Sequence, residues 1–308
     1  VMESIIKINE NDNVCVALED LKKGDIIDVS GRKILIKDDI KTGHKVAIKS
    51  IKSNENVIKY GFPIGHVFLD VEEGSHVHTH NLRTNLTGVR DYSFDPKLIV
   101  NNIKNENLTF KGYKRENGEV GIRNEIWIVP TVGCVNGIAD KIMERFKKEV
   151  GELKIDNSLV LKHNYGCSQL GDDHENTRNI LKDAIRHPNA GGVLVLGLGC
   201  ENNNMTDFKK LVGDINSSRI KFLISQEVSD EIEEGVKILK EIYEVVKNDE
   251  REDVKLSELK IGLKCGGSDG FSGITANPLL GRFSDFLIAQ GGTTVLTEVP
   301  EMFGAETI

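Results

Sequence analysis

The sequence predicts a small all-β module of the barrel or β-clip type, followed by an α/β domain with a mostly parallel sheet. Three observations support this fold class. Short β-branched runs fill the N-terminal part, apolar runs alternate with helical patterns from residue 112, and a polar, Asn-rich stretch lies between them. We therefore place the β module at 1–90, a linker at 91–111 and the α/β domain at 112–308. A chain of 308 residues is long enough for two domains.

Residues 1–90 form a series of short predicted strands separated by turns. β-Branched residues favour strands, and the Gly, Asp and Ser residues at the breaks favour tight turns. The runs recur about every 10–12 residues with no helical period between them, which is typical of a small barrel or β-clip. Strands are expected at 14–18, 26–29, 33–36, 45–48 and 57–60, with turns at 23–25, 30–31 and 42–44.

From residue 112 onward, apolar runs alternate with helical patterns. Runs that are apolar throughout indicate strands buried on both faces. Their alternation with helices predicts a parallel sheet with right-handed crossovers. Strands are expected at 126–129, 159–162, 192–196, 220–224, 260–263 and 293–297, and helices at 138–150, 173–186, 208–212, 229–248 and 279–290.

The composition excludes several classes of protein. Lys and Arg total 40 against 48 Asp and Glu, and this acidic balance argues against a nucleic acid held through its phosphates. The longest nearly uncharged apolar stretch, 190–200, is shorter than the ~20 residues that span a bilayer, and the start shows no signal-peptide pattern. Five sparse cysteines indicate reduced thiols, not a disulfide framework. We therefore expect a cytoplasmic protein that binds neither nucleic acid nor membrane.

Four cysteines occupy equivalent places in the pattern. Cys134, Cys167, Cys200 and Cys265 each follow a predicted strand and lie beside a glycine. Because the carboxyl ends of parallel strands meet at one edge of a sheet, where ligands bind, these thiols should gather there. Thiolates suit iron or zinc, although the absence of a C-x-x-C pair disfavours a zinc ribbon. The alternative is that they are small packing residues, since cysteine is among the most buried residue types.

A second candidate feature is the histidine-rich segment 74–81. In an extended chain, His76, His78 and His80 point to the same face, so three imidazoles could grip a divalent metal. The alternative is a solvated polar segment in which at most one histidine has a role.

Other motifs are weaker. Arg115 and Arg123 precede the first α/β strand, where their guanidinium groups could bind a carboxylate or form ordinary surface ion pairs. No phosphate-binding loop, dinucleotide fingerprint or hydrolase nucleophile elbow is present, so ATP, NAD and triad chemistry have no support.

Long runs across the chain resemble the altronate dehydratase / galactarate dehydratase family, which also includes sulfolactate sulfo-lyase. The N-terminal runs resemble the SAF module of that family, and the cysteine-bearing runs resemble its large lyase domain. The SAF-like runs are 14–18, 47–48, 59–65 and 74–82; the others are 112–115, 121–124, 165–174, 187–189, 197–203, 265–273, 276–278 and 298–306. Members with both domains usually continue past the last of these runs, so we expect the large domain to be incomplete at its C-terminus.

The resemblance implies an enzyme, a carbon–oxygen hydro-lyase of carbohydrate acid catabolism. The implied substrate is a sugar acid, D-altronate first, and the product is 2-keto-3-deoxy-gluconate. The implied cofactor is Fe(II), with Mn(II) as the second candidate. The expected protein partner is a further copy of the chain. Two alternatives stay open: galactarate dehydration or sulfolactate cleavage by the same family, and a non-catalytic fragment that binds sugar acids.

Residue roles follow from the candidate motifs together with the resemblance. Proton transfer is assigned to His76, His78 and His163. The expected metal ligands are His76, His78, His80, Cys167 and Cys200. The expected substrate-binding residues are Arg115, Arg123, Asn124, Ser168, Gln169, Glu201, Asn202, Ser268 and Asp269.

Overall fold

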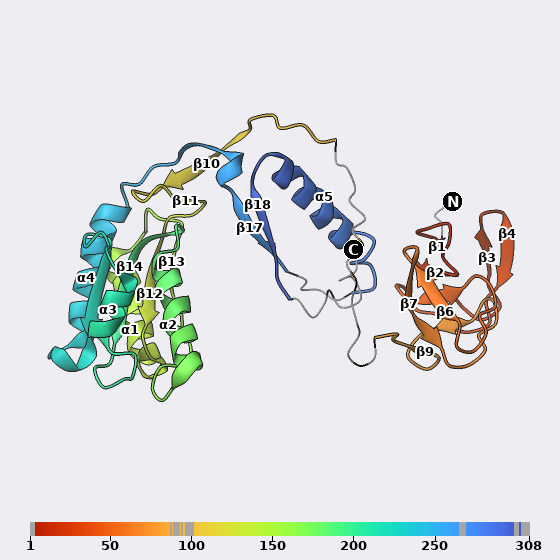
Figure 1. The fold of residues 1–308 in the computed structure, drawn as a ribbon, viewed down its shortest axis with the longest axis horizontal. Helices are drawn as coiled ribbons and strands as arrows, with labels where there is room; N and C mark the ends of the chain where they lie inside the picture. Colours follow the sequence, from red (N-terminus) through yellow and green to blue (C-terminus); the bar gives the residue numbers. More distant parts are fainter. Residues whose placement is uncertain are drawn as a thin grey trace. The chain divides into compact units, whose positions relative to one another are not determined.

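The computed structural model of the chain describes residues 4–86, 88, 93, 95, 102–264, 269–298 and 302 (Figure 1). It divides into two compact units. The first unit contains residues 1–104, 260–289 and 293–308, and the second contains 105–259 and 290–292. Among the described residues, no helix is both long and apolar enough to cross a membrane.

The N-terminal part of the first unit is built from short antiparallel strands, as the β-branched runs predict. One sheet has the order β1-β2-β5-β8, a second has the order β6-β7-β9, and β3 pairs with β4 as a hairpin. Buried aliphatic side chains from alternate strand positions fill two small cores, one around Ile34 and Val46 and one around Val57 and Val67. The strands are β1 (Ile5–Ile6), β2 (Val14–Ala17), β3 (Ile26–Val29), β4 (Arg32–Leu35), β5 (Lys45–Ala47), β6 (Asn56–Lys59), β7 (Phe62–Val67), β8 (His76–Val77) and β9 (Leu82–Arg83).

The first unit also contains the C-terminal strand–helix–strand segment. β17 (Lys260–Leu263) and β18 (Thr293–Leu296) pair in parallel, and α5 (Ala276–Ala289) connects them in sequence. All three elements lie where the alternation of apolar runs and helical patterns predicts them.

The second unit is a parallel sheet covered by helices on both faces. Its strands are β12 (Glu125–Pro130), β13 (Asn157–Val160), β14 (Ala190–Gly197) and β15 (Ile220–Ile224), in the order β13-β12-β14-β15. The helices are α1 (Asn136–Val150), α2 (Gly171–Ile185), α3 (Met205–Val212) and α4 (Glu231–Val246), each close to its predicted range.

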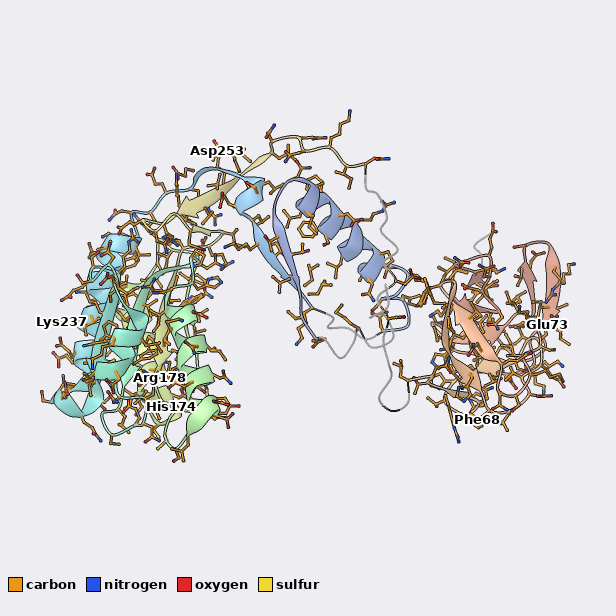
Figure 2. All side chains as sticks on the ribbon, in the orientation of Figure 1. Phe68, Glu73, His174, Arg178, Lys237 and Asp253 are labelled. Atoms are coloured by element: carbon orange, nitrogen blue, oxygen red, sulfur yellow. The ribbon has the colours of Figure 1, made fainter. Side chains whose placement is uncertain are left out.

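The side chains of the parallel strands alternate between the two faces of the sheet, so this unit has one core on each face. Ile126 and Ile128 pack with residues of α1 and α4, whereas Trp127 and Val129 pack with residues of α2 and α3. Successive strand side chains point to opposite faces, so every residue of the run is buried. Charged side chains such as Lys237 of α4 lie on the outside (Figure 2).

The sheets of the chain are a mixture of parallel and antiparallel. Besides the parallel sheets, the second unit has an antiparallel sheet of β10 (Thr109–Lys114), β11 (Val120–Gly121) and β16 (Glu252–Lys255), in the order β11-β10-β16. The expectation of a mostly parallel sheet after the β module therefore holds only for part of the chain. The domain limits at 90 and 111 stay predictions, because most of residues 87–101 lie outside the described ranges.

Candidate functional site

The carboxyl ends of the parallel strands in the second unit carry three loops that hold one another in place. The backbone N–H of Gly133 donates to the carbonyl of Tyr165 at 2.9 Å. The Asn203 amide donates to the carbonyl of Thr131 at 3.3 Å, and the Asn202 amide donates to the carbonyl of Gln169 at 3.1 Å. Each loop is thus bonded to the other two. We call the loops 131–134, 163–169 and 198–203 the cysteine rim.

The rim brings three of the four equivalent cysteines together. Cys134, Cys167 and Cys200 are all free and exposed, so the packing interpretation does not fit them. The pKa of Cys134 is raised, first by desolvation and then by the charge of the Cys167 thiol, a hydrogen bond with it and the charge of Cys200. Cys15, by contrast, is buried inside β2, and its burial raises the thiol pKa to about 12. Cys265 lies outside the described residues.

Glu201 anchors the third loop of the rim. Its side chain is buried and accepts hydrogen bonds from the Thr131 hydroxyl at 2.7 Å, the Leu198 N–H at 3.0 Å and the Gly199 N–H at 2.6 Å. Burial alone would raise the pKa of this carboxyl, but the hydrogen bonds outweigh it and hold the pKa below its ordinary value. Glu201 is therefore a buried carboxylate that shapes the loop, and its predicted contact with substrate stays a prediction.

His163 is fixed by backbone groups on the second loop. Its Nε2 lies 2.8 Å from the Pro130 carbonyl, and its Nδ1 lies 3.1 Å from the Tyr165 N–H. Because a carbonyl only accepts, Nε2 carries the hydrogen and Nδ1 is the acceptor. Gln169 similarly accepts from the Gly166 N–H at 3.2 Å, while Ser168 is exposed. The catalytic role of His163 and the substrate roles of Ser168, Gln169 and Asn202 stay predictions.

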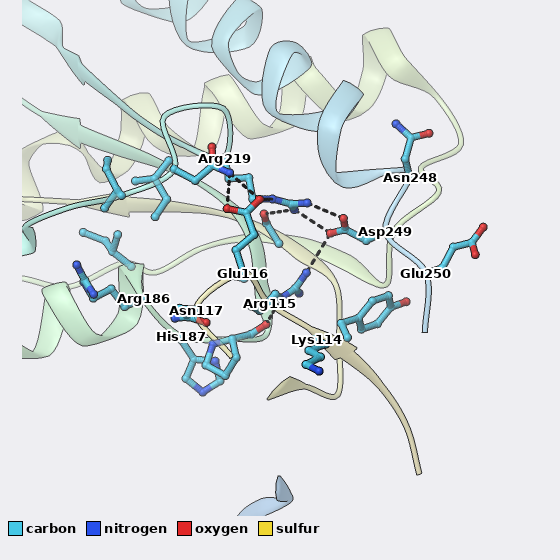
Figure 3. A pocket seen from close by; sticks show the side chains of 18 of the residues that line it. Lys114, Arg115, Glu116, Asn117, Arg186, His187, Arg219, Asn248, Asp249 and Glu250 are labelled. Atoms are coloured by element: carbon cyan, nitrogen blue, oxygen red, sulfur yellow. Dashed lines mark hydrogen bonds and ion pairs between the residues drawn. The ribbon is translucent and has the colours of Figure 1, made fainter. Parts of the chain in front are cut away.

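Three other predicted substrate residues lie at the opposite edge of the same sheet. Arg115 donates to the carbonyl of Pro188, to Asn124 and to Asp249, next to the points where β12 and β14 begin (Figure 3). β12 spans six residues, so the two edges are about 20 Å apart at the usual rise per residue. The structure therefore does not bring this group to the cysteines.

The side chains of this opposite edge are used within the fold. Asp249 accepts from Arg115 at 3.0 Å and from Arg219 at 2.7 and 2.9 Å. Burial lowers the pKa of Arg115, and Asp249 acts against that shift. Arg123 pairs with Glu125, and this pairing raises the pKa of Arg123. Asn124 is buried, and its amide donates to the Val246 carbonyl. A pocket of about 430 Å³ opens beside the Asp249 network, lined partly by Arg115 and Arg219.

In the first unit, four histidines form a stack that includes three predicted positions. The ring of His76 lies 5.4 Å from that of His78 and 5.2 Å from that of His80, between ring centroids. The chain turns at residues 78–81, so His80 reaches His76 through a turn and not along an extended strand. His44 is the fourth member, with its ring 5.1 Å from His76 and 4.8 Å from His78.

His44 was missed by the sequence analysis. It joins the stack because β5 and β8 pair antiparallel, with Val46 opposite His76 and Lys45 opposite Val77. No local pattern in the sequence predicts that pairing. We call His44, His76, His78 and His80 the histidine stack.

Two members of the histidine stack, His76 and His78, favour the neutral imidazole. Burial, followed by the neighbouring histidines, lowers the pKa of His76 to about 4. Burial, then His44 and Lys45, also lowers the pKa of His78. Neutral imidazole is the form that binds metals and accepts protons, so the donor chemistry of the stack fits a divalent metal. Even so, within the described ranges no group of three or more His, Cys, Asp or Glu side chains is arranged around a single metal ion.

Asp269 lies in a turn of the first unit that packs against Gly43, two residues before β5 begins. Its carboxylate accepts from the N–H groups of Phe271 and Ser272 at 2.7 and 3.1 Å. A Cβ on Gly270 would come within 2.7 Å of the Gly43 carbonyl, so only glycine allows this approach. The turn therefore lies next to the residue that precedes His44. The neighbouring candidate, Ser268, is outside the described residues.

Fold and side chains together define a modular chain in which a histidine-bearing β module is combined with a cysteine-rimmed α/β unit. Three family models match it in order. The altronate/galactarate dehydratase SAF domain matches residues 3–85, the second domain of D-galactarate dehydratase/altronate hydrolase matches 112–247, and the D-galactarate/altronate dehydratase C-terminal domain matches 256–308. The chain belongs to the altronate/galactarate dehydratase family.

Curated relatives agree with the family models. The chain is 65% identical over 308 residues to an altronate dehydratase of Bacillus subtilis (strain 168), which covers all of this chain and 62% of the relative. It is 54% identical over 304 residues to an altronate dehydratase of Escherichia coli (strain K12), covering 98% of this chain and 61% of the relative. It is 30% identical over 325 aligned residues to a galactarate dehydratase (L-threo-forming) of the same E. coli strain, covering 96% of this chain and 59% of the relative. The chain thus spans about three fifths of the length of these relatives.

Proposed function

We propose that the protein carrying this chain is a hydro-lyase that dehydrates a sugar acid, with D-altronate as substrate and 2-keto-3-deoxy-gluconate as product. The observation that carries the proposal is the 65% identity, along the whole chain, to a protein named altronate dehydratase. Galactarate is the second candidate substrate, supported by a lower identity of 30%.

The chemistry of this reaction sets three requirements. A base removes the proton on C2, the hydroxyl on C3 leaves with a proton as water, and the resulting enol rearranges to the 2-keto acid. The C2 proton is weakly acidic because it lies beside a carboxylate, so positive charge near that carboxylate lowers the barrier. Lowered pKa values leave His76 and His78 unprotonated at neutral pH, the form that a general base needs, which supports them as the proton-transfer residues.

Fe(II), with Mn(II) as the second candidate, is the proposed cofactor. A bound metal would supply the positive charge that stabilises the enediolate as it forms. Among the described residues, the imidazoles of the histidine stack and the thiols of the cysteine rim are suitable donors. Arg115 and Arg123 are less suited to hold the substrate, because their guanidinium groups are already paired with Asp249 and Glu125.

A cytoplasmic location belongs to the same proposal, since free thiols suit a reducing compartment. Association of further copies of the chain stays a prediction.

The test is a comparison of substrates under anaerobic conditions. The full-length protein, supplied with Fe(II), is incubated separately with D-altronate, galactarate and sulfolactate, and 2-keto acid is measured colorimetrically, with sulfite measured for sulfolactate. We expect D-altronate to give the fastest turnover. Faster turnover of galactarate or sulfolactate would reassign the substrate. Binding of a sugar acid with no product from any of the three would instead support a non-catalytic binding role.

A further inference from the structure

Lys59 is a buried cation in the first unit whose charge is not paired. It ends β6, and the residue is only 8% exposed. Lysine is almost never buried to this extent without an anionic partner, because removing an ammonium group from water is costly. Among the described residues, no oxygen accepts a hydrogen bond from its Nζ, which lies 4.5 Å from the centre of the Tyr60 ring. The ammonium group therefore has hydrogen-bonding capacity that this part of the chain does not use.

Asp12 is the acidic residue whose charge acts on Lys59, but its oxygens are used by backbone groups. One oxygen accepts from the Gly61 N–H at 2.8 Å, and the other accepts from the Asn9 N–H at 3.0 Å. Burial lowers the pKa of Lys59, and Asp12 only partly offsets this shift. Asp12 thus shapes the chain around the turn between β6 and β7 and does not neutralise the ammonium group.

Tyr60 has a backbone conformation that tyrosine rarely adopts. Its φ is +61°, and the following Gly61 has φ of +80°. These residues form the two-residue loop between β6 and β7, in which Lys59 pairs with Phe62. Such loops favour Asn-Gly, because a positive φ is unfavourable for a bulky side chain. Turn formation therefore does not explain the tyrosine, and its hydroxyl has no hydrogen-bond partner among the described residues. Strained residues of this kind concentrate at functional sites.

Lys45 is a second, partly buried lysine at the same core of the β module. Ala47, two positions after Lys45 in β5, and Val57, two positions before Lys59 in β6, belong to one buried core. Since alternate strand residues share a face, both lysines lie on the side of this core. Burial and then the charge of Lys59 lower the pKa of Lys45, so the two ammonium groups are close enough to repel each other. A bound anion would relieve this repulsion.

These cations lie next to the histidine stack. Lys45 directly follows His44, and its charge contributes, after burial and His44, to the lowered pKa of His78. A turn of the C-terminal segment reaches the same region, because a Cβ on Gly273 would lie 2.2 Å from the Tyr60 hydroxyl oxygen. Two ammonium groups, a phenol hydroxyl and neutral imidazoles thus come together in one part of the first unit.

We propose that Lys59, Lys45 and the Tyr60 hydroxyl bind the carboxylate of the sugar acid, an assignment that rests on the proposed function. All three groups donate hydrogen bonds, and charge-assisted bonds to a carboxylate are strong. The C2 proton lies beside that carboxylate, so binding here presents C2 to the histidine stack. The same positive charges stabilise the negative charge that develops on the carboxylate oxygens as the proton leaves. Arg115 and Arg123 do not offer such free charge, because both are paired within the second unit.

The test measures binding separately from turnover. The probe is a 3-deoxy aldonate of the same chain length as D-altronate, which has no hydroxyl on C3 to lose, and calorimetry measures its affinity for the full-length protein. Lys59→Met should weaken binding about 10- to 100-fold, and Lys59→Arg, which keeps the charge, should retain part of the affinity. Tyr60→Phe should weaken binding by about two- to tenfold. The corresponding alcohol, with CH₂OH in place of the carboxylate, should bind the parent and Lys59→Met proteins equally.

Lys33→Met is the matched control, because Lys33 is exposed on the β3–β4 hairpin and its loss should leave the affinity unchanged. Thermal unfolding verifies the fold, since replacing a buried, unpaired ammonium group by an apolar side chain should not lower the unfolding temperature. Unchanged affinity of Lys59→Met for the acid, or an equal loss for acid and alcohol, would overturn the proposal.

Turnover of D-altronate by the parent protein is measured alongside binding. Product formation together with unchanged affinity in Lys59→Met would refute this site and leave the proposed function standing. No product from any sugar acid, together with binding that depends on Lys59, would do the reverse.

Discussion

Nδ1 of His44 lies 2.9 Å from Nε2 of His76, so one of these rings donates its hydrogen to the other. The two residues are 32 positions apart in the chain; His44 directly precedes β5, and His76 lies in β8. Since the shared hydrogen bond needs one lone pair, protonating both rings would break it and place two positive charges side by side. The contact therefore couples the charge state of the histidine stack to the integrity of the β5–β8 pairing.

The first prediction is that acid loosens this part of the β module. Burial lowers the pKa of His76 from 6.5 to about 4, so between these values the unfolded segment binds protons that the folded one excludes. The neutral ring therefore contributes all of its stability above about pH 6.5, and this contribution is lost as the pH falls toward 4. Because His76 is only partly buried, the loss should be on the order of 1 kcal/mol.

Hydrogen exchange of the β5 and β8 amides across this pH range measures the effect. His76→Gln, which keeps a polar side chain without titrating, should flatten the pH dependence. An unchanged pH profile in His76→Gln would show that other groups control opening of the pair.

The second prediction concerns Asp249, which ties Arg115 and Arg219 together at the amino edge of the sheet (Figure 3). Its side chain is only 15% exposed, so Asp249→Asn leaves two partly buried guanidinium groups without their charge partner. We expect a loss of about 2–3 kcal/mol in the free energy of unfolding of the second unit. Denaturant titration followed by Trp127 fluorescence measures it.

Asp253→Asn is the control for this prediction. Asp253 pairs with Lys111 on the antiparallel sheet, but both side chains are more than 60% exposed, so its loss should cost less than about 0.5 kcal/mol. Equal effects of the two substitutions would contradict the assignment. A rise in KM for the sugar acid in Asp249→Asn, with stability unchanged, would support the predicted substrate role of Arg115.

The third prediction is that Glu201→Gln disturbs the rim. The carboxylate accepts hydrogen bonds from two backbone N–H groups and the Thr131 hydroxyl, and an amide nitrogen in its place would meet donors. We expect a loss of about 1–3 kcal/mol at neutral pH. The deficit should shrink on acidification, because the stability that a lowered carboxyl pKa provides is lost as pH falls through the folded value. Glu227→Gln, an exposed carboxyl on the next loop, should be neutral.

The regular elements of the fold were predictable because their signals are local. Apolar runs and helical periods placed all four strands of the parallel sheet and the helices around it within a few residues. β10 and β16 were missed, since Thr109 and Lys255 pair across a long sequence separation and neither strand is apolar throughout. The same limit hid His44, whose place depends on β5 lying beside β8.

The gathering of the cysteines followed from a general rule about parallel sheets. Residues that directly follow parallel strands lie at one edge of the sheet, so the sequence predicted that the cysteines gather there. The strand order then showed that the strands before Cys134, Cys167 and Cys200 are neighbours. The same rule separates Arg115 and Asn124 from the rim, because they precede β12 and so lie at the other edge. What sequence alone could not supply was the hydrogen bonding that occupies Glu201, His163 and Arg115 within the fold.

The last prediction tests whether close backbone approach holds the rim together. Gly166 has φ of +101°, and an added methyl group would meet the Thr131 carbonyl oxygen at 2.5 Å and the Val132 Cα at 3.0 Å. Both neighbours are backbone atoms that cannot rotate away, so Gly166→Ala combines conformational strain with a clash. We expect a loss of about 2–3 kcal/mol in the stability of the second unit, together with altered alkylation rates of Cys134 and Cys167.

Gly137→Ala is the matched control, because Gly137 lies in α1 with nothing within 4 Å of its added methyl group. That substitution should instead stabilise the unit by about 0.5–1 kcal/mol, since alanine is the better helix former. If Gly166→Ala were as stable as the parent protein and its thiols reacted at unchanged rates, the loops would not depend on this approach, and the hydrogen bonds between the loops would suffice to hold the rim.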